Sequence, residues 1–452
     1  HMSLLPFASW FPFAGLPLFF EVLFSVAFVI ILGMLVWTSV LFARGLRADR
    51  DMSEVGGQDD FEWIFMVPAL NEEVTIRDSI ERLEQIELAK KRIVVINDGS
   101  DDGTAEILAG IENPDLAVIE RVAPDARRGK AAALNFAYAQ ILEQFHPDPD
   151  RTIFCIVDAD GRISPESPGF IAHHFQDPQV GGVQSLVRIY NRHRFLTWFQ
   201  DVEFSIYGHL FQAGRNRWGT AGMGGNGQYN RLAALASIDD SKAEDPDMRP
   251  GSAGPWRDRL TEDQDLGLRL LLAGWHSHQD NRAMVDQQGL SNLGRLFKQR
   301  TRWSQGNLQA MRLIGPIARS DIHLPARIEQ VIYLLMPILQ GIVGASLVGA
   351  LVLRLGGTDL VGGSFWWILF IYLLGFGGSL MGCLAARVDN GIDLAGIIKG
   401  LLSAQVYAFY SWLLWPVLIR STGRQLIGVD SWAKTDREKI GTEAPAEDAL
   451  GP

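Results

Sequence analysis

The chain has 452 residues, of which 47% are hydrophobic and 21% charged, and its net charge is −11. This composition excludes a long disordered or low-complexity protein. The acidic balance argues against a nucleic-acid-binding protein, which would usually present a basic face. The two cysteines, Cys155 and Cys383, are far apart in the sequence. Neither a disulfide framework nor a cysteine-rich zinc site is therefore expected.

The amino-terminal region contains a candidate membrane span. The stretch Val22–Ala43 carries no charge and is long enough to cross a hydrocarbon core of about 30 Å as a helix. Arg44, Arg47 and Arg50 follow directly, and such residues favour the cytoplasmic side. We therefore expect an outward-facing amino terminus and a cytoplasmic domain after the span. A cleaved signal peptide is the alternative, but it would be shorter and begin with basic residues.

Between the two apolar ends, strands and helices are expected to alternate. The expected strands are Glu62–Leu70, Arg92–Ile96 and Thr152–Val157, and the expected helices are Glu72–Glu87, Ala105–Gly110 and Lys130–Gln144. This alternation predicts βαβ units and a parallel sheet. Ligands of such sheets bind outside the carboxyl ends of the strands. Each expected strand ends in a polar cluster, so a site is expected there.

Two of these clusters are acidic. Asn97–Gly103 reads NDGSDDG, for which an Asp/Gly turn is the structural alternative. Asp158 and Asp160 flank Ala159, and side chains two apart on an extended chain point the same way. Two such carboxylates suit Mg²⁺ or Mn²⁺ held partly by the phosphates of a substrate. An Asp-X-Asp pair also occurs often by chance.

Two further clusters lie later in the chain. Thr261, Glu262 and Asp263 precede an apolar helical pattern. They are either helix-capping residues or include a general base whose pKa is raised by its carboxylate neighbours. The run Gln299–Trp303 reads QRTRW, in which arginine suits a diphosphate and tryptophan stacks on sugars. The same run fits an amphipathic interfacial helix, and both interpretations can hold together.

Three apolar stretches follow, each long enough to span a membrane: Ile328–Leu353, Phe365–Ala386 and Ile397–Ile419. Buried core helices are the alternative, but tryptophans near the ends of these stretches favour a membrane. Three spans that start in the cytoplasm would leave the carboxyl terminus outside. The tail nevertheless carries five basic residues after position 419, which favour the inside. We expect a cytoplasmic tail, which requires one re-entrant stretch or an exception to the charge rule.

Taken together, the motifs resemble those of the membrane-bound family 2 glycosyltransferases, which include cellulose, chitin and hyaluronan synthases and some glycolipid synthases. They occur in family order over about residues 60–310 as Val67-Pro68 with Asn71-Glu72, Asp98–Ser100 with Asp102–Thr104, Gly129-Lys130 with Ala133–Asn135, Asp158–Asp160, Thr261–Asp263, and Gln299, Arg302 and Trp303. Each motif alone is weak, but six in order are specific.

The resemblance implies an α/β GT-A domain, Rossmann-like with a mostly parallel sheet, inserted between transmembrane and interfacial helices. It implies a UDP-sugar donor and Mg²⁺ or Mn²⁺ bound by Asp160. Asp263 would be the general base, with Glu262 as its catalytic neighbour. The implied donor and nucleotide contacts are Pro68, Glu72, Asp98, Lys130, Asp158, Gln299 and Arg302. The acceptor side would include Trp303, Gly225 and Asn226.

The domain boundaries expected from these assignments divide the chain into five parts. Residues 1–50 hold an interfacial segment and the first span, and residues 51–287 the cytoplasmic GT-A domain. Residues 288–325 form amphipathic interface helices with the QxxRW motif. Residues 326–421 hold the carboxyl-terminal spans, and residues 422–452 the tail.

The acceptor is the least determined part of the expected function. Gly224–Gln228 reads GGNGQ and resembles bacterial monoglucosyldiacylglycerol synthases, with a flexible turn as the alternative. The QxxRW motif and Ser431–Thr435, which reads SWAKT, instead resemble processive enzymes, the latter as a gating segment.

We therefore expect an inverting transfer of a sugar, with glucose as the expected one, to a membrane lipid such as diacylglycerol, which gives a β-glycosyl lipid. The alternatives are a processive β-glycan synthase that extends and translocates its polymer, and a catalytically inactive membrane scaffold. The protein is expected in the bacterial plasma membrane with its catalytic domain in the cytoplasm. Its expected partners are the donor, the acceptor and membrane lipids, with no nucleic acid, and a homo-oligomer is left open.

Overall fold

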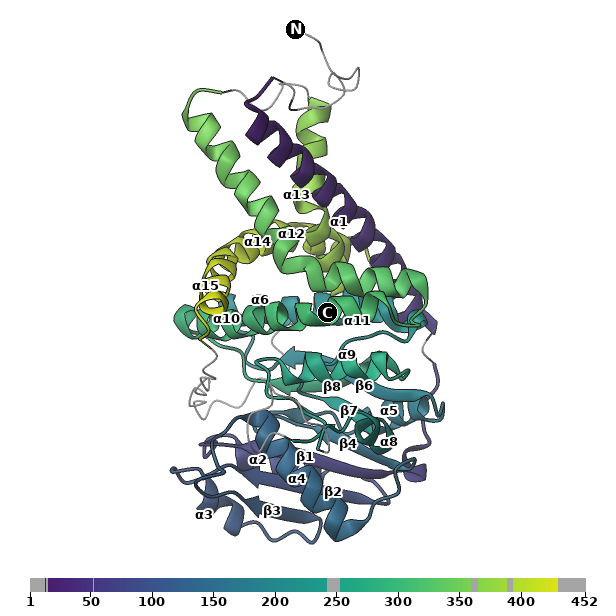
Figure 1. The fold of residues 1–452 in the computed structure, drawn as a ribbon. Helices are drawn as coiled ribbons and strands as arrows, with labels where there is room; N and C mark the ends of the chain where they lie inside the picture. Colours follow the sequence, from purple (N-terminus) through teal and green to yellow (C-terminus); the bar gives the residue numbers. More distant parts are fainter. Residues whose placement is uncertain are drawn as a thin grey trace.

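The computed structural model describes residue 13 and residues 15–51, 53–241, 253–358, 365–387 and 393–429. A sheet domain lies at one end of the molecule, and three helices rise from the opposite side of a layer of crosswise helices (Figure 1). The rising helices are α1 (Leu18–Asp51), α12 (Leu324–Leu355) and α13 (Phe365–Ala385). The SWAKT segment and the rest of the tail from residue 430 lie outside the described residues.

The domain is built on one eight-stranded sheet with the order β3-β2-β1-β4-β7-β6-β8-β5. Its strands are β1 (Glu62–Ala69), β2 (Lys91–Asn97), β3 (Leu116–Glu120), β4 (Thr152–Ile156), β5 (Arg162–Ile163), β6 (Val180–Ile189), β7 (Gln228–Arg231) and β8 (His276–Gln287). The pairs β1–β2, β1–β4, β2–β3 and β6–β8 are parallel. β7 runs antiparallel to β4 and β6, and β5 to β8.

The remaining helices cover the sheet or lie between it and the rising helices. They are α2 (Ile76–Glu84), α3 (Thr104–Ala109), α4 (Lys130–Phe145), α5 (Ser167–Phe175), α6 (Phe195–Ile206), α7 (Ala213–Arg215), α8 (Leu232–Ser237), α9 (Glu262–Leu272), α10 (Leu293–Ala310), α11 (Ile314–Ala318), α14 (Leu394–Leu413) and α15 (Trp415–Leu426). Four short turns of helix complete the set: η2 (Gln58–Asp60), η3 (Tyr207–Gln212), η4 (Asn216–Trp218) and η5 (Met311–Leu313).

Both faces of the central strands are buried, which explains why these strands read as continuous apolar runs. In β1 the side chains of Trp63 and Phe65 enter the core beneath α2 and α5. Ile64 and Met66 enter the opposite core, beneath α4, α8 and α9. The expected mostly parallel α/β sheet is thereby confirmed. The strands β3, β5, β6, β7 and β8 were not expected, because strands that are short, contain glycine or are largely polar carry a weak apolar pattern.

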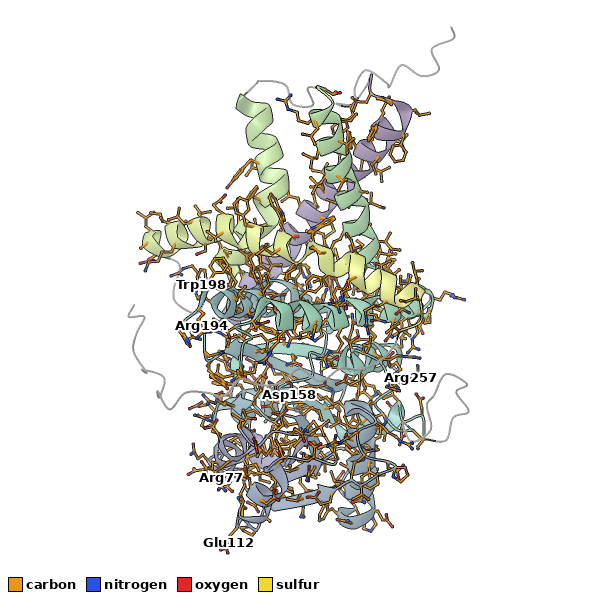
Figure 2. All side chains as sticks on the ribbon, turned by 90° about the vertical axis from the view of Figure 1, so that its left-hand side faces the viewer. Arg77, Glu112, Asp158, Arg194, Trp198 and Arg257 are labelled. Carbon is orange, nitrogen blue, oxygen red and sulfur yellow. The ribbon has the colours of Figure 1, made fainter. Side chains whose placement is uncertain are left out.

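Three helices in the described part of the chain are long and apolar enough to cross a membrane: Leu18–Asp49, Leu324–Leu355 and Leu394–Leu426. The expected span Phe365–Ala386 corresponds to α13. Its part Gly375–Ala385 is an apolar helix that is shorter than these three. The stretch Leu394–Leu426 comprises α14 and α15. Figure 2 shows this pair running across the base of the rising helices, beside the sheet domain.

A buried ion pair fixes the start of α12 to the sheet domain. The Nη2 atom of Arg215 lies 2.8 Å from Oε1 of Glu329, and the two side chains are 1% and 2% exposed. Gln330 donates a hydrogen bond to the carbonyl oxygen of Thr220. Both residues of α12 lie one turn inside its start, so the membrane helix and the domain share a rigid junction.

We predict that Glu329→Gln lowers the free energy of unfolding by about 3 kcal/mol, because it leaves the buried Arg215 charge uncompensated. The measurement is thermal unfolding in detergent micelles. Asp125→Asn, which removes the exposed partner of Arg128, is the control and should leave the melting temperature nearly unchanged. Equal shifts for both variants would contradict the role of the junction.

Candidate active site

The carboxyl ends of the strands open into a cavity of about 510 Å³. Twelve of the thirteen residues expected to form the site line it: Pro68, Glu72, Asp98, Lys130, Asp158, Gly225, Asn226, Glu262, Asp263, Gln299, Arg302 and Trp303. They meet because β1, β2 and β4 are parallel and end at one edge. β7 begins there too, with Gln228 opposite Ile156. The individual roles expected for these residues stay predictions.

Lys130 is the first residue of α4 and lies among three carboxylates. Its Nζ is 2.7 Å from Oδ1 of Asp158 and 3.7 Å from Oε1 of Glu262. Burial alone would lower the pKa of Lys130, but Asp158 and Glu262 outweigh that effect and raise it, with a smaller contribution from Asp263. Lys130 therefore stays cationic at every physiological pH.

Asp263 has the properties of a general base. Burial and the neighbouring Glu262 carboxylate raise its pKa to about 7, although Lys130 opposes the shift. The backbone N–H of Gln264 donates to its Oδ1 at 2.8 Å. A carboxylate with a pKa near neutrality can accept a proton and still release it afterwards. The chemistry available here is proton removal from a hydroxyl group.

The glycine-rich loop Gly224–Gln228 packs closely against the side chain of Asp263. Gly225 has a φ of +81°, and a Cβ atom at this position would lie 2.8 Å from Oδ2 of Asp263. Asn226 is 3% exposed, and its Oδ1 accepts from the N–H of Asp158 at 3.0 Å. Its Nδ2 donates to Oε1 of Gln287 at 3.0 Å. These contacts position the loop against Asp158, and an acceptor role for Gly225 and Asn226 stays a prediction.

Asp98 lies in the wall of the pocket and forms a buried ion pair with Arg121. Burial raises the pKa of Asp98, and the Arg121 guanidinium opposes that shift. Sequence reasoning missed Arg121 because it follows β3, which is one of the strands that were not expected. The short apolar run Leu116–Glu120 is the signal that could have revealed it, since a parallel β3 ends at the same edge as β2.

Asp160 is the one expected site residue that does not line the cavity. Its side chain is 3% exposed, and Oδ2 accepts from the N–H of Gln288 at 3.0 Å. Asp158, two residues earlier, has a half-buried side chain on the cavity wall. Within the described residues there is no group of three side chains that could hold a metal ion. Two hard carboxylates fit Mg²⁺ or Mn²⁺ only if the diphosphate supplies further oxygen ligands.

Apart from the α10 residues Gln299, Arg302 and Trp303, the membrane-facing wall of the cavity was not expected from the sequence. It is largely aromatic and comes from α6, η3, α10, α12 and α14, with Phe204, Tyr207, Phe211, Trp303, Tyr333 and Tyr407 among its residues. Trp303 packs edge-on against Phe204, with ring centroids 6.1 Å apart. The amide of Gln264, next to Asp263, donates to the hydroxyl of Tyr333 at 3.1 Å. The helix that carries the candidate base thus contacts a membrane helix.

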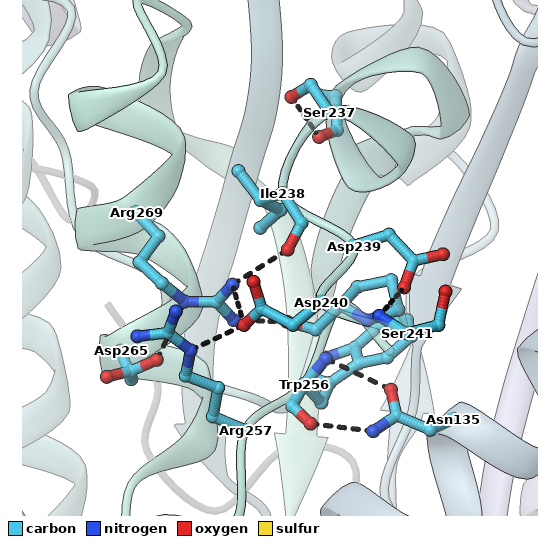
Figure 3. A network of polar contacts seen from close by, with 12 residues as sticks. Asn135, Ser237, Ile238, Asp239, Asp240, Ser241, Trp256, Arg257, Asp265 and Arg269 are labelled. Carbon is cyan, nitrogen blue, oxygen red and sulfur yellow. Dashed lines mark hydrogen bonds and ion pairs between the residues drawn. The ribbon is translucent and has the colours of Figure 1, made fainter. Parts of the chain in front are cut away.

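A polar network behind the cavity holds α9 in place (Figure 3). The Nε of Arg269 lies 2.9 Å from Oδ2 of Asp265, and Nη1 lies 3.4 Å from Oδ2 of Asp240. On the α4 side, Asn135 and the backbone of Trp256 exchange hydrogen bonds of 2.6 and 3.0 Å. Because α9 begins with Glu262 and Asp263 and α4 begins with Lys130, this network holds two helices that both start at the cavity.

Comparisons with known proteins agree with this arrangement. The family described as "Glycosyltransferase like family 2" matches residues 62–306. The poly-beta-1,6-N-acetyl-D-glucosamine synthase of Staphylococcus aureus (strain COL) is 28% identical over 274 residues, which cover 60% of each chain. The protein of the same name from Staphylococcus epidermidis is 27% identical over 274 residues, which cover 60% of this chain and 59% of that protein. The match therefore spans about 60% of the length of these relatives.

Among solved structures, the mannosyltransferase PcManGT from Pyrobaculum calidifontis, in complex with GDP-Man and Mn²⁺, has a similar fold. The TM-score is 0.56 at 16% sequence identity, and the alignment covers 90% of this chain and 99% of the other. This similarity shows the fold alone. The family match, over residues 62–306, covers more than half of the sequence. The chain belongs to glycosyltransferase family 2.

Proposed function

We propose that this protein is an inverting membrane glycosyltransferase that moves a sugar from a UDP-sugar to the hydroxyl group of an acceptor at the membrane. The observation that carries the proposal is the position of Asp263 in the cavity, where burial and the neighbouring Glu262 raise the pKa of its carboxyl group to about 7. It shares one cavity with Lys130, Arg302 and Trp303. A base near neutrality beside cationic groups suits the deprotonation of an alcohol and the departure of a diphosphate.

The transfer follows from these positions. Asp263 takes the proton of the acceptor hydroxyl as its oxygen attacks the anomeric carbon of the donor. The bond from that carbon to the diphosphate breaks, and Lys130 and Arg302 stabilise the charge on the departing UDP. In-line attack on an α-linked donor inverts the centre and gives a β-linkage. Asp158 lines the cavity and would hold Mg²⁺ or Mn²⁺ with the diphosphate, whereas the buried Asp160 would join it only with its carboxylate turned towards the cavity. The cation would supply positive charge that neutralises the leaving group.

A membrane lipid such as diacylglycerol is the first candidate acceptor, with glucose as the proposed sugar. The support is the aromatic wall that α6, η3, α12 and α14 contribute to the cavity, because an apolar chain needs such a path from the membrane to Asp263. A growing β-glycan is the second candidate. It is supported by the relatives named as poly-beta-1,6-N-acetyl-D-glucosamine synthases and by the QxxRW motif. A scaffold without activity leaves the arrangement around Asp263 unexplained.

We further propose that the protein lies in the bacterial plasma membrane with its catalytic domain in the cytoplasm. The helices α1, α12 and α13 would cross the membrane, whereas α14 and α15 would lie along its inner surface (Figure 2). Support comes from the contacts of α15 with α10, where Nε of Arg424 donates to Oε1 of Gln305 at 3.1 Å. Three crossings that begin outside end inside, in agreement with the basic tail.

The pH dependence of transfer tests the proposed base. Because only the ionised form of Asp263 accepts a proton, kcat/KM should fall about tenfold per pH unit below about 7 and be flat above it. Glu262→Gln removes a charge that raises the pKa of Asp263. The fall of kcat/KM at low pH, which is the acid limb of the profile, should therefore move to lower pH in this variant. Glu143→Gln, an exposed change at the far end of α4, is the control. An unmoved limb in Glu262→Gln would contradict the assignment.

A product assay separates the two acceptors. The purified protein receives Mn²⁺ and UDP-glucose, UDP-N-acetylglucosamine or UDP-galactose, with or without diacylglycerol, and products are identified by mass spectrometry. We expect release of UDP that depends on added lipid and a lipid that carries one or two hexoses. A ladder of oligosaccharides formed without lipid would instead establish the glycan synthase.

The proposed topology predicts where reporters fused to the chain are active. Alkaline phosphatase fused after residue 429 should be inactive, and a fluorescent protein at the same place should fluoresce. Fusions after Gly357, between α12 and α13, are the control and should behave in the opposite way. An active phosphatase after residue 429 would show that α14 and α15 cross the membrane.

A further inference from the structure

One acidic side chain in the aromatic wall of the cavity has no part in the transfer described above. Glu203 lies on α6 and lines the cavity next to Phe204 and Tyr207. Its side chain is 29% exposed. A carboxylate in such a wall loses hydration, which is costly unless its oxygens find partners. The contacts of Glu203 therefore indicate what it does.

Among the described residues, the hydrogen-bond partners of Glu203 bind one of its two carboxylate oxygens. Nη2 of Arg300 lies 2.6 Å from Oε2, and the hydroxyl of Tyr410 donates to the same Oε2 at 3.1 Å. Within the described part of the chain, Oε1 has no hydrogen bond to another residue. An ionised carboxylate can accept about four hydrogen bonds, so Glu203 keeps acceptor capacity for a molecule in the cavity.

The groups around Glu203 indicate the chemistry of that molecule. Arg300 stacks on the ring of Trp303, with its guanidinium carbon 4.1 Å from the ring centroid, and Trp303 contacts Phe204. Aromatic faces and a carboxylate together match a sugar or polyol, which presents C–H faces to rings and hydroxyl groups to an oxygen acceptor. A hydrocarbon chain alone would make no use of the carboxylate.

We propose that Glu203 binds a second hydroxyl group of the acceptor, beside the one that Asp263 deprotonates. The inference rests on the proposed glycosyl transfer, and it predicts that acceptors with at least two hydroxyls on the head, namely sugars of a glycan or of a glycolipid, bind more tightly than diacylglycerol. Arg300 and Tyr410 position Glu203 from behind. Diacylglycerol, which has a single hydroxyl, gains nothing from Glu203.

The test compares acceptors that differ in this second hydroxyl. Dioleoylglycerol, glucosyl-dioleoylglycerol and a β-linked disaccharide are each supplied with a UDP-sugar and Mn²⁺, and KM for the acceptor is measured. Glu203→Met removes the hydrogen-bond acceptor. It should raise KM for the sugar-headed acceptors about tenfold or more, since hydrogen bonds to charged groups are strong. KM for dioleoylglycerol and the rate of donor hydrolysis should change less than twofold.

Glu143→Met, the same substitution at an exposed position at the far end of α4, is the matched control; its acceptor KM should stay within twofold of the original. Equal losses for all acceptors and for donor hydrolysis in Glu203→Met would assign Glu203 to a structural role. Use of dioleoylglycerol but not of the sugar-headed acceptors would also overturn the inference. If the unmodified protein transfers sugar to none of them, the proposed function itself fails.

Discussion

The balance of charge around Lys130 is the constraint on which the candidate site depends. One ammonium group faces the carboxylates of Asp158, Glu262 and Asp263. A partly buried set with more negative than positive charge cannot ionise fully at low cost, so the proton affinity of one of its carboxylates rises. That carboxylate is Asp263. A diphosphate would add further negative charge to this set, so its binding requires additional cationic groups. Arg302 of α10 lines the cavity and is such a group.

The fold keeps this cluster together by starting several elements at one edge of the sheet. Lys130 begins α4, Glu262 and Asp263 lie in the first turn of α9, and Asp158 follows β4. The network of Arg269, Asp265 and Asp240 holds α9 from behind (Figure 3). Gln264, the neighbour of Asp263, also contacts Tyr333 of α12. A movement of the membrane helices relative to the domain would therefore shift the position of the candidate base Asp263.

The sequence predicted the donor side of this arrangement better than the membrane side. Asp98, Lys130 and Asp158 follow strands or begin helices with clear periodic patterns, and topology alone brings them together. Glu203 and Arg121 carry no motif, since their positions depend on packing between α6 and the membrane helices and on the unexpected strand β3. Asp160 lies behind the cavity wall, which spacing along a strand cannot reveal.

The central claim is that Asp263 removes the proton of the acceptor. The most direct measurement combines transfer by Asp263→Asn with the affinity of this variant for UDP, determined by calorimetry. The account predicts that kcat falls by about 10²–10⁴-fold, whereas UDP binds with nearly unchanged affinity. Normal turnover in this variant would contradict the assignment of the base.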